Sequence, residues 1–185
     1  LWINMTTAIL LGLMLAFDMG GPVNKVAYAF MLICVSQGVY SVVAIAAVGI
    51  AVPPLGMGLA TLIGRKYFTA EERETGKAAL VMGCVGVTEG AIPFAAADPL
   101  RVIPANMIGA ASGCVTAALM GAQCYAGWGG LIVLPVVQGK LGFIAALLVG
   151  ACVSAACVIV LKALAKKKSS DAKADDELDL DFEIN

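Results

Sequence analysis

Residues 141–161 constrain the fold most, because they contain no charged side chain and are followed closely by four lysines. A helix needs about 20 apolar residues to cross the hydrocarbon core of a bilayer, and this run is long enough. The lysines, which begin at Lys162, indicate that the end after this helix is cytoplasmic. The chain is 61% hydrophobic and only 14% charged, so it has too little polar surface for a soluble protein of this size. We therefore expect an all-α, polytopic membrane helical bundle.

A second charged segment, residues 64–77, predicts another connection on the cytoplasmic side. Thr69, followed by acidic residues, has the pattern of a helix N-cap. If 64–77 and the lysines after 161 lie on the same side, residues 80–135 must cross the membrane an odd number of times. Residues 106–125 are uncharged and rich in Gly, Ala and Ser, which suits one closely packed crossing. Residues 80–105 are then left as a re-entrant hairpin.

The composition of residues 80–105 explains why this segment should not span the membrane. It contains three prolines together with Glu89, Asp98 and Arg101. Proline interrupts helix, and a charge at the bilayer centre costs at least about 2.5–3.5 kcal/mol on insertion scales. Irregular backbone persists at that depth only where protein buries it or water lines it. A Gly-rich segment at 126–135 predicts either a second partial re-entry or an interfacial loop. Trp128 would either stack on a sugar or anchor at the headgroups, and anchoring is favoured.

The upstream part of the chain is less constrained. Residues 4–17 are apolar, and residues 26–63 contain no charge. The latter run is too long for one helix and tight for two. We expect one helix plus a half-hairpin, with a break at Pro53 and Pro54, and leave the number of crossings open. Because the chain starts without Met and without a signal peptide, we expect it to begin inside a larger protein.

The charges divide the chain into two parts. Residues 1–170 carry eleven Lys and Arg against six Asp and Glu, whereas residues 171–185 carry one Lys against seven acids. We predict a membrane permease segment over 1–165, incomplete at its N-terminus. We predict a basic-then-acidic, disordered cytoplasmic tail over 166–185.

Glu89 is the strongest candidate for a functional side chain, because an ionisable residue within a membrane segment is a functional hypothesis by default. Its carboxylate can accept hydrogen bonds from two vicinal hydroxyls of a sugar. Gly90 would allow the backbone close to a ligand, and Phe94 would offer a ring face to a pyranose. The alternative is that Glu89 forms a buried structural ion pair with Arg101 or Lys25.

Four further residues are candidates for substrate binding. Asp98 and Arg101 are three residues apart, so a structural ion pair is favoured over ligand contact, and Asp98 before Pro99 also fits a helix N-cap. Asp18 and Asn24 flank two glycines and a proline that open a helix end. The freed backbone amides and Asn24 would hold substrate hydroxyls; an ordinary turn is equally compatible with this pattern.

The sequence predicts no cofactor, no metal site and no nucleic-acid partner. It contains no His, no nucleotide-binding glycine motif and no basic surface for nucleic acid. Its six cysteines lie mostly within apolar runs, without a Cys-x-x-Cys pair, so we interpret them as small apolar side chains.

Three motifs resemble one known family. The segments DMGGPVNK (18–25), GVTEGAIPFAAADPLRVIP (86–104) and NMIGAA (106–111) are similar to the fructose-type enzyme IIC of the bacterial phosphoenolpyruvate sugar phosphotransferase system. The match runs along nearly all of 4–165, and the C-terminal sequence resembles the 2-O-mannosylglycerate branch. The resemblance implies a homodimeric, multi-pass sugar permease of the bacterial inner membrane. It would work with IIA and IIB domains, in the lipid bilayer, and Glu89 matches the family's sugar-binding glutamate.

Two departures from the family pattern limit what the resemblance implies. Fructose permeases of this type tend to read Pro-His-Gly-Gly where this chain has Gly127-Trp128-Gly129-Gly130, which argues against simple fructose. The phosphorylated Cys and His of the IIB and IIA domains are absent, so no catalytic residue is predicted and the chain would not transfer phosphate alone. The alternatives are an ion-coupled secondary sugar transporter, which also uses broken helices and midplane carboxylates, and a membrane subunit whose charges are only structural.

Overall fold

The computed structural model describes residues 2–183 and is almost entirely helical. Its elements are α1 (Trp2–Phe17), α2 (Pro22–Ser36), α3 (Tyr40–Ile63), η1 (Arg65–Tyr67), α4 (Ala70–Val85), η2 (Thr88–Ala91), α5 (Ile92–Ala97), α6 (Pro99–Leu119), β1 (Gln123–Cys124), η3 (Leu131–Val136), β2 (Val137–Gln138) and α7 (Lys140–Glu183). The expected all-α membrane bundle is confirmed.

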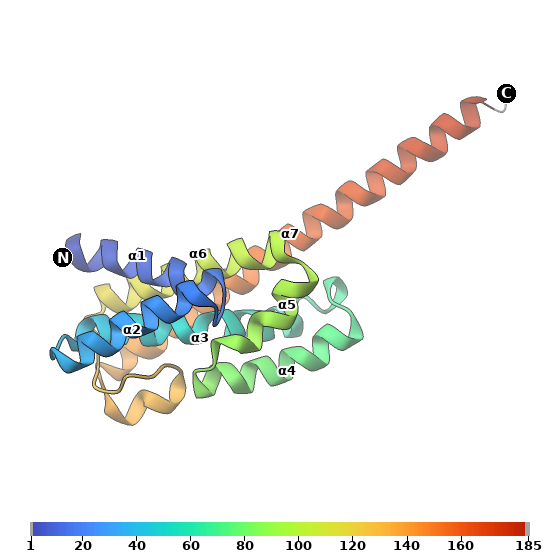
Figure 1. The fold of residues 1–185 in the computed structure, drawn as a ribbon. Helices are drawn as coiled ribbons and strands as arrows, with labels where there is room; N and C mark the ends of the chain where they lie inside the picture. The colour runs from blue at the N-terminus through green and yellow to red at the C-terminus, as the bar shows by residue number, and fades with distance from the viewer. Residues whose placement is uncertain (1, 184–185) are drawn as a thin grey trace.

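Three helices in the described part are long and apolar enough to cross a membrane: α3, α6 and the first part of α7. They lie side by side, with α3 almost wholly buried at the centre. α3 and α7 run toward the same end of the bundle and α6 runs back (Figure 1). We call this end, which carries Lys66, Arg101, Lys162 and Lys166, the basic end.

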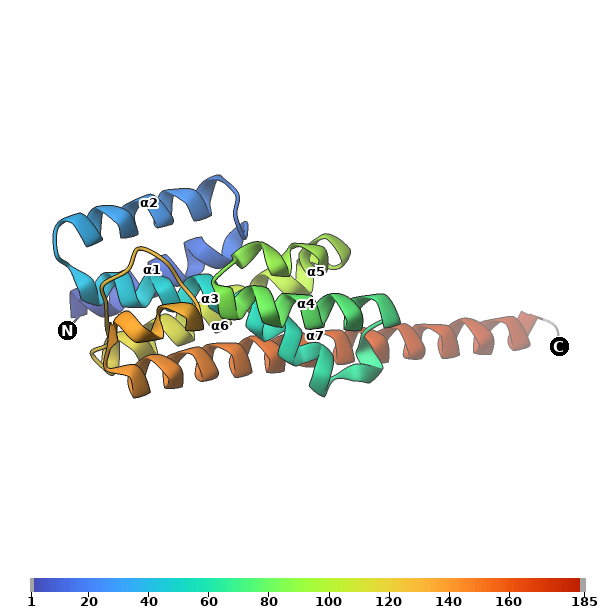
Figure 2. The ribbon, with the colours of Figure 1, turned by 90° about the horizontal axis from the view of Figure 1, so that it is seen from below.

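The predicted cytoplasmic hairpin is present, with different bounds from the sequence prediction. Its first arm is α4, which starts at the basic end with the expected N-cap. The Thr69 hydroxyl accepts a hydrogen bond from the Glu72 amide, and the Glu72 carboxylate accepts one from the Thr69 amide. α4 ends at Gly86, which is left-handed at φ 85°, and α5 then returns toward the basic end (Figures 1 and 2).

The crossing helix after this hairpin begins earlier than predicted. The uncharged run predicts a crossing over residues 106–125, whereas α6 runs from Pro99 to Leu119. Pro104 lies only in the second turn of α6. Its missing amide frees the carbonyl of Leu100, a residue that is 85% exposed, so the break costs little.

A second hairpin, formed by α1 and α2, enters from the opposite end of the bundle. α1 runs inward beside α6, the chain turns at residues 18–21, and α2 runs back outward (Figure 2). α2 begins with proline at its N-terminus, where a missing amide donor carries no penalty. Many large apolar side chains of this hairpin are exposed, including Leu10, Phe30 and Ile33, as expected of a membrane protein.

The predicted break at Pro53 and Pro54 is wrong. Both prolines lie inside α3, which is continuous from Tyr40 to Ile63. Residues 26–63 therefore form the rest of α2 and one full helix, instead of one helix and a half-hairpin. The prolines are buried among neighbouring helices, and such surroundings tolerate helix-breaking residues within a membrane.

Between α6 and α7 the chain folds back against α3 instead of crossing directly to the next helix. Strands β1 and β2 pair antiparallel at the base of this segment, which includes η3. At its far end Gly130 donates a hydrogen bond to the carbonyl of Ala47, in the first half of α3. The choice between a partial re-entry and an interfacial loop stays a prediction.

α7 continues as one helix to Glu183 and extends beyond the other helices (Figure 1). This backbone differs from the disordered tail predicted for residues 166–185. Half of its residues are Ala, Lys, Leu or Glu, which are good helix formers, whereas its commonest residue, Asp, is a poorer one. An isolated charged helix has only marginal stability in water, so a disordered tail in solution stays a prediction.

Candidate functional site

The tips of the two opposed hairpins meet within the bundle. Gly20, in the turn between α1 and α2, lies directly against the side chain of Glu89 in η2. A methyl group at Gly20 would be 2.8 Å from Glu89 Oε1 and 2.9 Å from its Cγ. Gly20 has φ 112°, a conformation that glycine adopts readily. Two motifs nearly 70 residues apart in the sequence therefore form one site.

The Glu89 carboxylate makes no ion pair or hydrogen bond with any residue that the structure describes. The side chain is exposed, and Arg101 pairs with Asp98 instead. Neither structural partner considered for Glu89, Arg101 or Lys25, is engaged with it. An unpaired acceptor beside a glycine turn is available to a hydroxylated ligand.

Asp18 and Asn24 hold the turn that presents Gly20. The Asp18 carboxylate accepts hydrogen bonds from the amides of Val23 (2.7 Å) and Asn24 (2.9 Å), which lie in the first turn of α2. The buried Asn24 side chain donates to the Leu15 carbonyl at 2.7 Å, near the end of α1. Both side chains therefore form hydrogen bonds with the chain's own backbone, as the ordinary-turn alternative predicts. Both also lie at the site.

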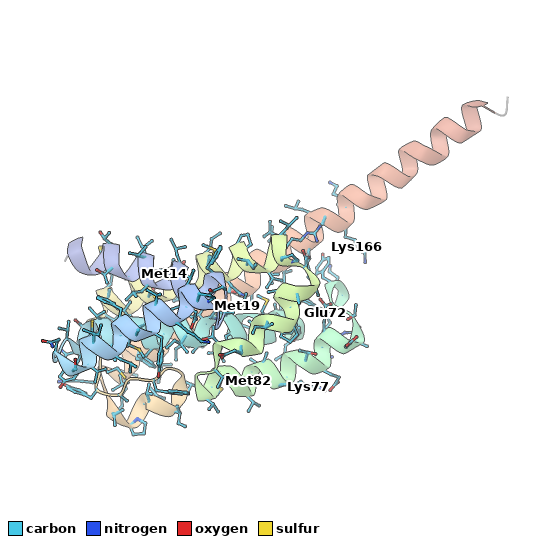
Figure 3. The ribbon with its side chains drawn as sticks, viewed as in Figure 1. Met14, Met19, Glu72, Lys77, Met82 and Lys166 are labelled. Atoms are coloured by element: carbon cyan, nitrogen blue, oxygen red, sulfur yellow. The ribbon has the colours of Figure 1, made fainter. Side chains whose placement is uncertain are left out.

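Met19 anchors the same turn to the transmembrane helices. It is a non-glycine residue with positive φ, 43°, and its side chain is buried. Asn106 of α6 donates to the Met19 sulfur at 3.6 Å and accepts a 2.7 Å hydrogen bond from Ser154 of α7. Figure 3 labels Met19 beside the turn between α1 and α2. A fully buried polar pair therefore connects the hairpin tip to the α6–α7 interface.

The segment between α6 and α7 supplies a third contact to the site. Gly86 lies against the carbonyl of Gly129, and the Trp128 indole donates a 2.7 Å hydrogen bond to the carbonyl of Val85. This bond satisfies an orphan acceptor at the C-terminal end of α4. Trp128 also packs edge-on against Tyr28 of α2, with ring centroids 6.3 Å apart. Trp128 therefore ties this segment to both hairpins, a role that the predicted interfacial anchoring does not describe.

Gly90 and Phe94 lie on the packed side of the first hairpin. A methyl group at Gly90 would be 3.0 Å from Met82 and 3.1 Å from Pro54, so this glycine permits close packing of η2 on α3 and α4. Phe94 is 1% exposed and belongs to a core cluster. Neither residue presents an open face beside the Glu89 carboxylate.

Asp98 and Arg101 lie at the basic end, apart from the hairpin tips. They form the predicted ion pair, with 2.7 Å between Asp98 Oδ2 and an Arg101 terminal nitrogen. Asp98 is the N-cap residue of α6, as predicted, although its side chain makes no capping hydrogen bond. The structure therefore divides the predicted site into one group at the tips and another at the basic end.

Sequence reasoning missed the contact of Gly20 with Glu89 and the role of Asn106. Gly20 belonged to a motif that was singled out, but nothing local indicated its partner. Asn106 begins the uncharged crossing and the motif NMIGAA, but neither pattern indicates its bond to the turn at residues 18–21. A buried asparagine in an apolar helix is itself a signal, because such a side chain needs hydrogen-bond partners.

Known proteins match this chain closely in sequence. The fructose-like permease IIC component 2 of Escherichia coli (strain K12) is 80% identical over 179 residues, which cover 96% of this chain and 50% of that protein. A fructose-specific EIIC component of the PTS from Haloferax volcanii is 38% identical over 90% of this chain and 44% of its own length. A fructose-specific EIIB'BC component of Vibrio cholerae is 46% identical over 91% of this chain and 30% of its own length.

The chain thus spans about half the length of the first of these relatives and less of the others. No protein-family model matches the chain. No solved structure matches it either. The identities confirm the resemblance that the three motifs indicate.

Proposed function

We propose, since this chain belongs to the fructose-type IIC components of the phosphotransferase system, that it forms part of a sugar permease and that Glu89 binds the sugar. The observation that supports this most is the unpaired Glu89 carboxylate where the tips of two opposed hairpins meet. Transporters commonly build midplane substrate sites from such interrupted helices.

The chemistry of the tips suits a polyhydroxylated ligand. A carboxylate accepts hydrogen bonds at two oxygens, so it can take two adjacent sugar hydroxyls. The Gly20 amide has no hydrogen-bond partner among the described residues and supplies a donor beside those oxygens. Asp18, Asn24 and Asn106 position this donor by fixing the turn.

Several features of the whole permease follow as proposals. The sugar is fructose or a fructose-like compound. The partners are the IIA and IIB domains, since related chains are named as EIIB'BC and EIIABC components. The permease is a homodimer in the bacterial inner membrane, with the basic end and the C-terminus cytoplasmic. The 2-O-mannosylglycerate branch stays a prediction, because none of the three relatives compared above carries that name.

Sugar binding by the full-length permease in lipid nanodiscs tests the role of Glu89. We expect Glu89→Gln to weaken fructose binding at least about tenfold, because hydrogen bonds to a charged acceptor are worth about 1.5–3 kcal/mol. Glu74→Gln is the matched control, since Glu74 is an exposed acid paired with Lys77. If Glu89→Gln binds fructose as tightly as the wild type, the Glu89 carboxylate does not bind the sugar.

Uptake into vesicles distinguishes group translocation from ion-coupled transport. Uptake should require the phosphorylated IIA and IIB domains and should deliver phosphorylated sugar. Accumulation of unmodified sugar driven by a proton or sodium gradient would instead identify a secondary transporter.

A further inference from the structure

A hollow of about 840 Å³ opens at the basic end, between the start of α4, the α5–α6 junction and α7. This volume is within the range of about 300–1,000 Å³ that is usual for small-molecule sites. Its lining carries four cationic side chains, Lys66, Arg101, Lys162 and Lys166. It also carries three carboxylates, Glu71, Glu72 and Asp98.

Two of the carboxylates are committed to ion pairs. Glu72 pairs with Lys162 at 2.7 Å, and both side chains are largely buried, so this pair belongs to the framework. Figure 3 shows Glu72 at the end of the molecule near the exit of α7. Asp98 binds one terminal nitrogen of Arg101 and is itself 14% exposed, whereas Arg101 is 41% exposed. A guanidinium has five N–H donors, so most of the Arg101 donors face the hollow or solvent.

The remaining charges favour an anion. Lys66 and Lys166 are exposed and have no ion-pair partner among the described residues. Only Glu71 opposes them without a partner of its own. Lys66 contacts the Tyr67 ring, with its ammonium 4.9 Å from the ring centroid, and keeps its charge unpaired. Two ammonium groups without an ion pair and a guanidinium with spare donors match a phosphate monoester, which carries a charge of about −1.5 to −2 at neutral pH.

One short helix, α5, leads from the hairpin tip to the hollow, and its six residues span about 9 Å. Pro93, Phe94 and Ala97 of α5 line the hollow, while η2 with Glu89 immediately precedes α5. A ligand that leaves Glu89 along α5 toward the basic end therefore reaches these cations.

We propose that this hollow binds the phosphate group of the phosphorylated sugar after it leaves Glu89. The inference rests on the proposed function for the identity of the ester. The phosphate distinguishes the product from the incoming sugar, because the cations attract the ester and not the neutral sugar. The hollow thereby favours movement of the product away from Glu89.

Binding to the full-length permease in nanodiscs tests the proposal with three probes: fructose, a fructose monophosphate and inorganic phosphate. The double substitution Lys66→Gln/Lys166→Gln removes two charges from the hollow. The matched control, Lys77→Gln/Lys140→Gln, removes two exposed lysines outside it. We expect the hollow variant to bind the monophosphate and inorganic phosphate roughly tenfold more weakly, with a reduced salt dependence and unchanged fructose affinity.

Two results would overturn the proposal: unchanged monophosphate affinity in the hollow variant, or an equal loss of affinity in the control. If the unchanged affinity is accompanied by slower phosphoryl transfer from the donor domain, the hollow is a protein-docking surface instead. The wild-type permease could bind no fructose while phosphate affinity falls in the hollow variant and not in the control. In that case the hollow is an anion site, and the proposed sugar function is wrong.

Discussion

At the scale of single residues, the site depends on a contact that only glycine permits. Gly20 touches the Glu89 side chain and has a positive φ, so both sterics and backbone geometry exclude a larger residue there. Asp18 and Asn24 fix this turn with their side chains, and Met19 secures it to Asn106. The polar residues of the motif therefore position the backbone, and Glu89 is left free to bind.

Replacing Gly20 by alanine should damage sugar binding more than folding. The new methyl group would lie 2.8 Å from Glu89 Oε1 and displace the carboxylate, so we expect at least a tenfold loss of fructose affinity. Gly38→Ala is the matched control, because Gly38 also has positive φ, 74°, but no atom lies within 4 Å of the added methyl. Both variants should lose about 1 kcal/mol of stability from backbone strain. Equal sugar affinity in the two variants would contradict the contact.

At the scale of elements, the bundle depends on close helix contact at small residues. Gly109 of α6 faces Ser154 and Gly150 of α7, and a methyl group there would be 2.5 Å from Ser154 Cβ. Small residues at such interfaces let helices approach closely within a membrane. The same interface contains the Asn106–Ser154 hydrogen bond that connects to the hairpin tip.

Gly109→Ala should therefore destabilise the α6–α7 pair. Overpacking of this kind costs about 1–3 kcal/mol, which denaturant unfolding of the full-length permease in detergent micelles would measure. Ile108→Ala on the same helix is the control, because Ile108 is 50% exposed and a surface change typically alters stability by less than about 0.5 kcal/mol. A loss in the control equal to that in Gly109→Ala would refute a tight interface at this glycine.

Elements were predictable from sequence where the signal was local. The apolar run at 141–161, the Thr69 cap and the interrupted hairpin all carry such signals. The break predicted at Pro53 and Pro54 is wrong because the effect of proline on a helix depends on its packing, and α3 is buried by other helices around these residues. The start of α6 was missed because proline breaks a helix interior but is tolerated near its first turn.

At the scale of the whole molecule, the arrangement is two hairpins that enter from opposite ends and meet beside three long helices (Figures 1 and 2). No pattern within either motif predicts the meeting of residues 20 and 89, because that contact arises only when α1 and α4 pack on α6 and α3. The motifs indicated which residues carry chemistry, and the packing determined which of them come together.

A structure of the full-length permease with bound sugar would decide whether Glu89 binds the substrate. We expect a sugar between the two hairpin tips, with its hydroxyls within about 3 Å of the Glu89 carboxylate oxygens. A sugar bound away from the tips would contradict this role of Glu89, as would a Glu89 carboxylate paired with a lysine or arginine in the bound state.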